Sequence, residues 1–173
     1  MAFDEIRVEE PADIPHIRTV TEDAFRDRPY ADGDEQDVID RLRADSALSL
    51  SLVATLAGKP IAHVAFSPAH NTDGSKPWYA LGPVSVTPEL QSEGIGAAII
   101  EAGLARIRSW GARGCILTGN PVYYRRFGFE LAPENTPEAE SAEYFMLKCF
   151  DQPAPSGLFQ FHRAFYGSDG EPQ

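Results

Sequence analysis

The sequence predicts a mixed α/β fold in which helices flank a central, mostly antiparallel sheet. Three observations carry this prediction. Segments with the apolar spacing of helices alternate with segments typical of strands along most of the chain. Two neighbouring strand segments are joined by a short turn, which requires an antiparallel pair. Farther along, a strand, a glycine-containing loop, a helix and a short apolar strand follow one another, and this order is typical of a parallel βαβ unit.

In the first half of the chain, a strand is followed by two helices and then by three strands. Asp13 is a favourable N-cap, and Pro15 is tolerated in a first helical turn. Pro83 cannot donate to a sheet ladder, so it predicts a bulge or a point where its strand leaves a neighbour. The expected ranges are a strand over 3–10, helices over 14–25 and 35–44, strands over 48–56, 61–66 and 78–86, and a polar loop over 67–76.

The second half predicts one long helix, followed by short elements. Gly111 is placed to end the long helix, and the apolar run from Gly114 is typical of a strand buried on both faces. The expected ranges are a helix over 95–110, a strand over 114–118, a short helix over 121–126, a loop from 129, a strand over 144–150, and a final strand over 158–165 with Phe159, Phe161 and Phe165 on one face. We expect a single domain over 1–166 and a frayed tail over 167–173.

Composition excludes several classes of function. The chain has 173 residues, of which 43% are hydrophobic and 24% charged, so we expect a globular protein rather than a disordered one. It lacks an apolar run of about 18 residues and has an acidic N-terminus, so we expect a soluble cytoplasmic protein without a membrane partner. A net charge of −11 without a basic cluster argues against nucleic acid. Cys115 and Cys149 form no metal-binding pattern and are interpreted as reduced core residues.

The segment Gln91-Ser-Glu-Gly-Ile-Gly-Ala-Ala98 follows a strand and opens a helix. The first amides of a helix have no internal partner and carry partial positive charge, so this loop is suited to binding a phosphate. It does not fit a Walker loop, which would end in Gly-Lys-Ser/Thr, or a dinucleotide fingerprint, because Ile99 stands where a third glycine belongs. The alternative is that the glycines only permit a tight turn.

Two segments together resemble the GNAT superfamily of N-acyltransferases. The run from Leu81 to Gly96 contains Gln-x-x-Gly-x-Gly after a strand end and is similar to the acyl-CoA motif of that family. The run Asn-Pro-Val-Tyr-Tyr-Arg-Arg-Phe-Gly-Phe, over 120–129, is similar to its Tyr-x-x-x-Gly-Phe motif. The order of elements agrees over nearly the whole chain. The resemblance implies a GNAT-type fold with one parallel βαβ splay at the cofactor site.

The same resemblance implies an N-acetyltransferase that moves the acetyl group of acetyl-CoA directly to a primary amine, with acetyl-CoA as co-substrate and no metal. In this reading the pantetheine arm pairs with the strand before the loop, and the loop amides hold the diphosphate. The implied cofactor-binding residues are Val84, Ser85, Val86, Gln91, Ser92, Gly94, Ile95, Gly96, Ala97 and Asn120.

The resemblance also implies a general acid for the departing thiolate. Tyr124, four residues before Gly128, matches the family's tyrosine, and Tyr123 is its rival. Both tyrosines can instead be interpreted as packing residues. The base that deprotonates the amine stays open, because 79–86 contains no acid. His63 is the first candidate for it, and Glu22, Asp23, His70 and a water chain are the alternatives.

Two other functions stay open: a non-catalytic module that only binds acyl-CoA, and a nucleotide-phosphate-binding protein. The amine would be selected by 14–44 and 67–76, whose acidic residues favour a cationic acceptor. The identity of that amine stays open. A homodimer also stays possible, with the phenylalanines of 158–165 as a contact.

Overall fold

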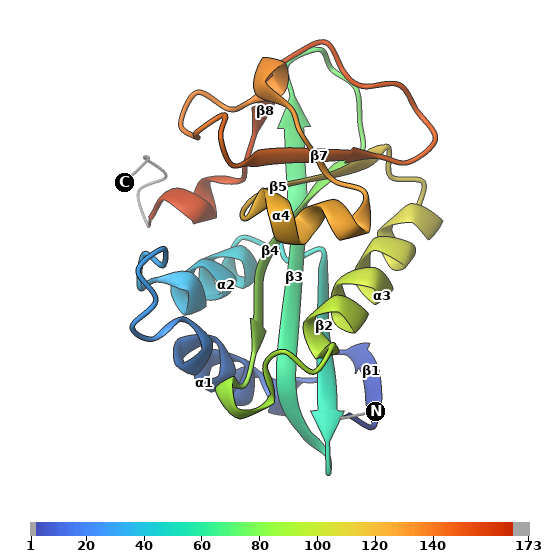
Figure 1. Ribbon diagram of the computed structural model, residues 1–173. Helices are drawn as coiled ribbons and strands as arrows, with labels where there is room; N and C mark the ends of the chain where they lie inside the picture. The colour runs from blue at the N-terminus through green and yellow to red at the C-terminus, as the bar shows by residue number, and fades with distance from the viewer. Residues whose placement is uncertain (1–2, 168–173) are drawn as a thin grey trace. The chain divides into compact units, whose positions relative to one another are not determined.

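The computed structural model describes residues 3–167 (Figure 1). These residues form two compact units. Unit 1 comprises 3–66 and 82–103, and unit 2 comprises 67–81 and 104–167. The single domain expected over 1–166 stays a prediction, and the expected tail lies, apart from Gly167, outside the described residues.

Unit 1 contains strands in the order β1-β2-β3-β4, with antiparallel pairing from β1 to β2 and from β2 to β3. β3 and β4 are neighbours in this order, and just after the end of β4 Thr87 N donates to Ile61 O of β3 at 2.8 Å. The elements are β1 (Glu5–Val8), α1 (Ile14–Phe25), α2 (Glu35–Ala44), β2 (Leu50–Leu56), the first part of β3 (Lys59–Asn71), the end of β4 (Trp78–Val86) and the start of α3 (Ile95–Ser109).

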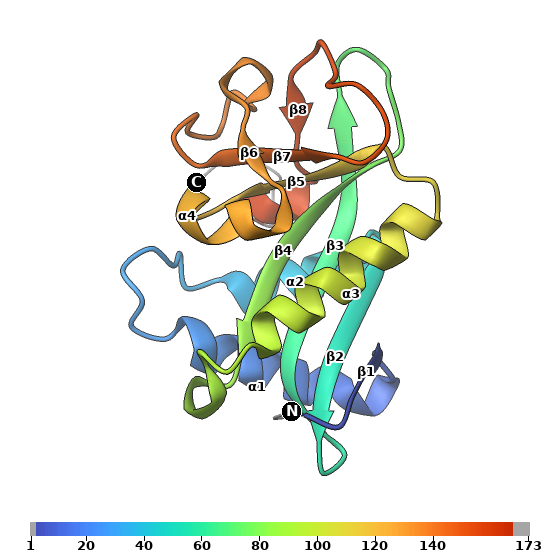
Figure 2. The ribbon, with the colours of Figure 1, turned by 45° about the vertical axis from the view of Figure 1, so that its right-hand side comes forward.

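Helices cover both faces of the unit 1 strands (Figure 2). On one face, Ile17 of α1 and Ile39 of α2 pack with Val53 of β2, which explains the apolar spacing of both helices. On the other face, α3 approaches β3 so closely that a Cβ at Gly103 would overlap the ring of Phe66. The expected sheet flanked by helices is therefore confirmed.

The start of α1 differs from the prediction. A 3₁₀ turn over Pro11–Asp13 precedes the helix, and the Asp13 side chain does not cap it. The carboxylate instead accepts from Glu10 N at 2.7 Å and from Arg7 Nη1 at 2.6 Å. The Arg7 guanidinium thereby holds the pKa of this buried carboxyl below its ordinary value. Asp13 thus ties α1 to β1, because an arginine outcompetes the helix amides for it.

Unit 2 orders its strands β3-β4-β5-β7-β6, and β8 pairs with β3. The β4–β5 pair is parallel and covers Trp78–Ala80 with Gly114–Ile116, whereas β5–β7, β6–β7 and β3–β8 are antiparallel. The predicted parallel βαβ unit is confirmed. The elements are β5 (Gly114–Thr118), α4 (Pro121–Tyr124), β6 (Glu130–Leu131), β7 (Phe145–Cys149) and β8 (Phe159–Gln160).

The core of unit 2 explains why β5 is so apolar. Trp78, Ile116, Phe145 and Phe159 belong to one buried cluster, and the rings of Trp78 and Phe159 meet edge to face with centroids 5.1 Å apart. Cys115 is fully buried and Cys149 partly buried, and both are free thiols, as expected. Burial raises the pKa of the Cys115 thiol far above its ordinary value.

Two strand ends in unit 2 were predicted wrongly, and one short strand was not predicted. β3 continues to Asn71 instead of ending at Phe66, because the buried Asn71 amide donates to Gly157 O at 3.0 Å. The final strand stops at Gln160, and a 3₁₀ helix over Arg163–Tyr166 follows, in which His162 Nδ1 accepts from Ala164 N. Phe159, Phe161 and Phe165 therefore do not share one strand face. The short β6 falls within the expected loop.

β4 runs three times as long as its ladder with β5. The pairing with β5 ends at Ala80, whereas β4 continues through Pro83 to Val86. This fits the prediction that the strand leaves a neighbour near Pro83, which has no N–H to donate. Within residues 3–167, no helix combines the length and apolarity that a membrane crossing requires.

Candidate active site

The loop between β4 and α3 lies in unit 1 and contains a 3₁₀ helix over Pro88–Leu90. After the strand ends at Val86, Ser92 and Gly94 adopt the left-handed region with φ of 67° and 85°. The first bond of the α3 ladder runs from Ala98 N to Gly94 O at 3.1 Å. The amides of Ile95, Gly96 and Ala97 therefore precede the helical ladder and are available to an acceptor. This is the arrangement the sequence predicted for an anion-binding turn.

Gln91 holds the start of this loop against the strand. Its Nε2 donates to Val86 O at 3.0 Å, and its Oε1 accepts from Arg28 Nη2 at 2.9 Å. The two bonds orient the side-chain amide at both ends. Arg28 lies 63 residues before Gln91 in the sequence, so no spacing pattern in the chain could have singled it out.

At the end of β4, one side chain is occupied within unit 1. Ser85 is buried, and its Oγ lies 3.4 Å from Thr21 Oγ1 on α1. Thr21 already donates to Ile17 O at 2.7 Å, so Ser85 is the donor in this pair. Val84 and Val86 flank Ser85 and are half-buried. A ligand lying along this strand would therefore meet its backbone rather than the Ser85 hydroxyl.

His63 lies on β3, opposite Val53 of β2, and is fully buried. Its Nε2 lies 2.7 Å from Ser51 Oγ, and Ser51 also donates to the carboxylate of Glu9. Because Ser51 has a single proton and Glu9 accepts it, His63 donates from Nε2 and keeps Nδ1 unprotonated. Among residues 3–167, Nδ1 has no hydrogen-bond partner.

Burial, with a smaller effect of Arg43, lowers the pKa of His63 to about 3. The ring is therefore neutral at physiological pH and has no solvent-exposed surface. These properties favour a structural role, and the role of His63 as a base stays a prediction. Of the alternatives, Glu22 pairs with Arg18 and Asp23 with Arg26, each at 2.9 Å, while His70 is exposed on β3 of unit 2.

The second motif lies in unit 2. Asn120 caps α4, accepting from Val122 N at 2.9 Å. The rings of Tyr123 and Tyr124 meet edge to face, with centroids 5.0 Å apart. The Arg126 guanidinium lies over the Tyr123 ring, 4.3 Å from its centroid. The Tyr124 ring packs against Gly119, where a Cβ would approach to 2.6 Å, so the glycine after β5 makes room for it.

Comparisons with known proteins identify the class of protein that carries these elements. The profile described as "Acetyltransferase (GNAT) family" matches residues 15–129, more than half of the chain. The Escherichia coli K12 protein named "Uncharacterized N-acetyltransferase YhbS" is 33% identical over 159 residues, which cover 91% of this chain and 86% of that protein. The chain therefore belongs to the GNAT acetyltransferase family. The predicted family and enzyme class are confirmed.

Solved structures agree with this assignment. A GNAT family acetyltransferase from Brucella melitensis, solved in complex with acetyl-CoA, is 46% identical, with a TM-score of 0.83 over 93% of this chain and 97% of that one. YhbS from Escherichia coli, solved in complex with CoA, is 28% identical, with a TM-score of 0.87 over 97% of this chain and 94% of that one. The predicted GNAT-type fold is confirmed.

Proposed function

We propose that this protein transfers the acetyl group of acetyl-CoA to a primary amine. The observation that carries the proposal is the loop from Gln91 to Ala97, whose last amides precede the α3 hydrogen-bond ladder. Support also comes from the Brucella melitensis relative, which was solved with acetyl-CoA.

The proposed donor site uses main-chain atoms. The amides of Ser92, Gly94, Ile95, Gly96 and Ala97 would bind the diphosphate, and the backbone of Val84–Val86 would pair with the pantetheine arm. A hydrogen bond to a charged group contributes about 1.5–3 kcal/mol. Several such bonds would contribute to diphosphate binding. The burial of the Ser85 side chain is consistent with recognition by backbone here.

In the proposed reaction, the amine nitrogen attacks the thioester carbonyl directly. The C–S bond of the tetrahedral intermediate then breaks, and the phenol of Tyr124 donates its proton to the CoA thiolate. A thiol of pKa about 8.5 and a phenol of about 10 differ by roughly 1.5 units, about 2 kcal/mol, which local hydrogen bonds can offset. Asn120 would set the start of the α4 turn that carries Tyr124, and Tyr123 is the alternative acid.

The amine must attack in its neutral form. We propose that a chain of water molecules carries its proton to bulk solvent, because the His63 ring is fully buried and its Nε2 is bonded to Ser51 Oγ. The acceptor would be a small-molecule or protein amine.

Thiol release from acetyl-CoA across a panel of amines tests the proposal, with CoA binding measured separately by calorimetry. Turnover with at least one amine supports it. CoA binding without turnover for any amine would instead favour the non-catalytic acyl-CoA-binding module. Stabilisation by ATP or NAD that exceeds stabilisation by CoA in a melting experiment would favour a nucleotide-binding protein.

A further inference from the structure

The proposed donor loop lacks a cation of its own. From Thr87 to Ala97 the sequence contains Glu89 and Glu93 but no lysine or arginine, and the whole chain carries a net charge of −11. A diphosphate diester adds two further negative charges. Backbone amides offer hydrogen bonds and partial charges, yet they do not neutralise a full charge. A cation from elsewhere in unit 1 would resolve this imbalance.

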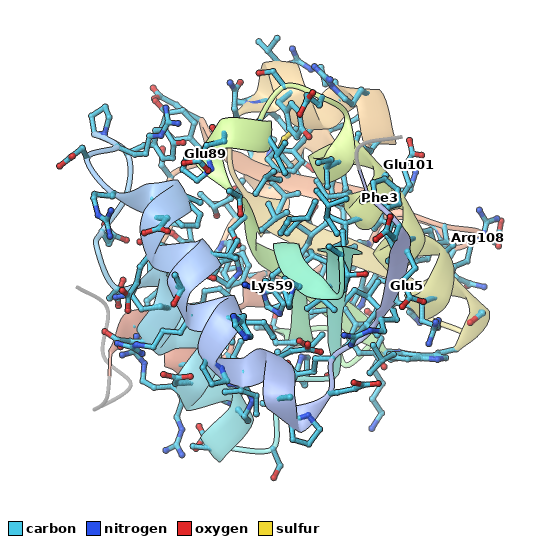
Figure 3. The ribbon with its side chains drawn as sticks, turned by 90° about the horizontal axis from the view of Figure 1, so that it is seen from below. Phe3, Glu5, Lys59, Glu89, Glu101 and Arg108 are labelled. Atoms are coloured by element: carbon cyan, nitrogen blue, oxygen red, sulfur yellow. The ribbon has the colours of Figure 1, made fainter. Side chains whose placement is uncertain are left out.

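One arginine is hydrogen-bonded to this loop. Arg28 lies just after α1, in a turn where its N–H donates to Phe25 O at 3.2 Å and its carbonyl accepts from Ala31 N at 3.1 Å. Its side chain reaches Gln91 at 2.9 Å. Figure 3, in which Glu89 is labelled, shows the turn before α3 beside the segment that follows α1. Two segments far apart in sequence thus meet at the start of the loop.

The Arg28 side chain is exposed, and most of the N–H donors of its guanidinium are available to a ligand. A guanidinium has five N–H donors, and within residues 3–167 that of Arg28 makes the one bond to Gln91 and no ion pair. Arg26, two residues earlier, differs because it pairs with Asp23 at 2.9 Å. Arg28 is therefore a cation that the fold places beside the loop without neutralising it.

We propose that Arg28 is a donor-binding residue that supplies the cation for the diphosphate of CoA, and that Gln91 holds its guanidinium at the loop. This inference deepens the proposed function and rests on it. The planar fork of a guanidinium can donate to two phosphate oxygens at once, while another of its five N–H groups keeps the bond to Gln91 Oε1. The bond between Arg28 and Gln91 thereby connects the segment after α1, which is part of the region expected to select the amine, to the donor site.

Calorimetry with CoA and with dephospho-CoA tests this inference. The R28Q variant should bind both ligands about ten- to a hundredfold more weakly than the wild type, the range that corresponds to one charge-assisted contact. The CoA affinity of the R28K variant should lie between those of R28Q and the wild type, because an ammonium keeps the charge but cannot bind two phosphate oxygens in the way a guanidinium does. The R26Q variant, changed in the same segment, should bind CoA as the wild type does.

A further readout separates charge from fold. The R28Q variant should melt within about 1 °C of the wild type without ligand, since an exposed side chain with one hydrogen bond contributes little to stability. Its CoA affinity should also depend less on salt concentration than that of the wild type, because salt screens a charge pair that the variant lacks.

Each outcome decides the matter. Equal binding of CoA by R28Q and wild type would overturn the role of Arg28 while leaving the proposed function intact. A loss confined to CoA, with dephospho-CoA unaffected, would assign Arg28 to the 3′-phosphate and overturn the diphosphate contact. Absence of CoA binding by the wild type would overturn the proposed function and this inference with it.

Discussion

The hydroxyl oxygens of Thr21 and Ser85 lie 3.4 Å apart, with Ser85 as donor, and connect α1 to the C-terminal end of β4. The Ser85 side chain is thus committed to the interior of unit 1. For this reason a pantetheine arm lying along this strand end, as we propose, would meet its backbone and not the Ser85 hydroxyl. Removing the hydroxyl separates these two roles of Ser85.

The S85A variant should lose about 1 kcal/mol of unfolding free energy, the usual contribution of one buried hydrogen bond. Its CoA affinity should change less than twofold, because the backbone amide and carbonyl stay in place. Denaturant unfolding and calorimetry measure the two quantities. A large loss of CoA affinity in a folded S85A variant would show that the hydroxyl itself contacts the donor.

The G96E variant should abolish CoA binding, because it places a side chain and a negative charge where the diphosphate would contact the first turn of α3. The G96A variant is the matched control: it adds one methyl group without charge and should weaken binding less. Unchanged CoA affinity in G96E would mean that the diphosphate lies elsewhere.

The Y124F variant should lower kcat at least tenfold and change CoA affinity less than twofold, since the phenol proton is used only as the thiolate leaves. Y123F is the control, because the Tyr123 ring lies under Arg126. Steady-state kinetics with the best amine of the panel measure both. If Y123F is inactive and Y124F active, the acid is Tyr123.

His63 should make the protein sensitive to acid. Its pKa falls from an ordinary 6.5 to about 3 in the folded protein, so between these pH values the unfolded chain binds one proton more. Unfolding free energy therefore decreases as pH falls, by up to about 1.4 kcal/mol per unit, or about 2–3 kcal/mol between pH 7 and 4.5.

The H63Q variant should lack this contribution, so its unfolding free energy should decline less than that of the wild type over the same pH interval. The exposed His16 provides the control H16Q, which should follow the wild-type curve. Parallel curves for H63Q and wild type would show that the buried ring does not carry the depressed pKa.

Alanine normally stabilises a helix by about 1 kcal/mol relative to glycine. At Gly103 the sign should reverse, because a Cβ would overlap the Phe66 ring. We expect G103A to lose about 1–3 kcal/mol of unfolding free energy, a usual cost of overpacking. The double variant G103A/F66L should recover part of the loss, and chemical denaturation checks both. A stabilised G103A would contradict the close approach of α3 to β3.

The elements with strong local signals were predicted well. The apolar spacing of Ile17 and Ile39 indicated α1 and α2, and the continuous apolar run from Gly114 indicated β5, because burial on one or both faces leaves a periodic trace in the sequence. The glycines of the donor loop were also recognisable, since few side chains fit a turn that opens a helix.

Elements held by distant partners were predicted poorly. Asn71 and Ser67 are polar and suggested a loop, yet both are fully buried in β3, and the end of that strand, at His70 and Asn71, pairs with β8. The capping role expected of Asp13 was lost to Arg7, which lies in the preceding strand. Neither the partner of β3 nor the partner of Asp13 can be recognised from the residues adjacent in the sequence.

The sequence by itself determined the family, the order of helices and strands and the loop that opens α3, because each depends on short-range spacing and on residues with restricted backbone geometry. Only the tertiary structure decided that His63 is buried and bonded to Ser51, which in turn donates to Glu9, and that Arg28 donates to Gln91. These depend on which side chains meet after residues far apart in the chain have packed, and hydrogen-bonding and burial energies act on that proximity alone.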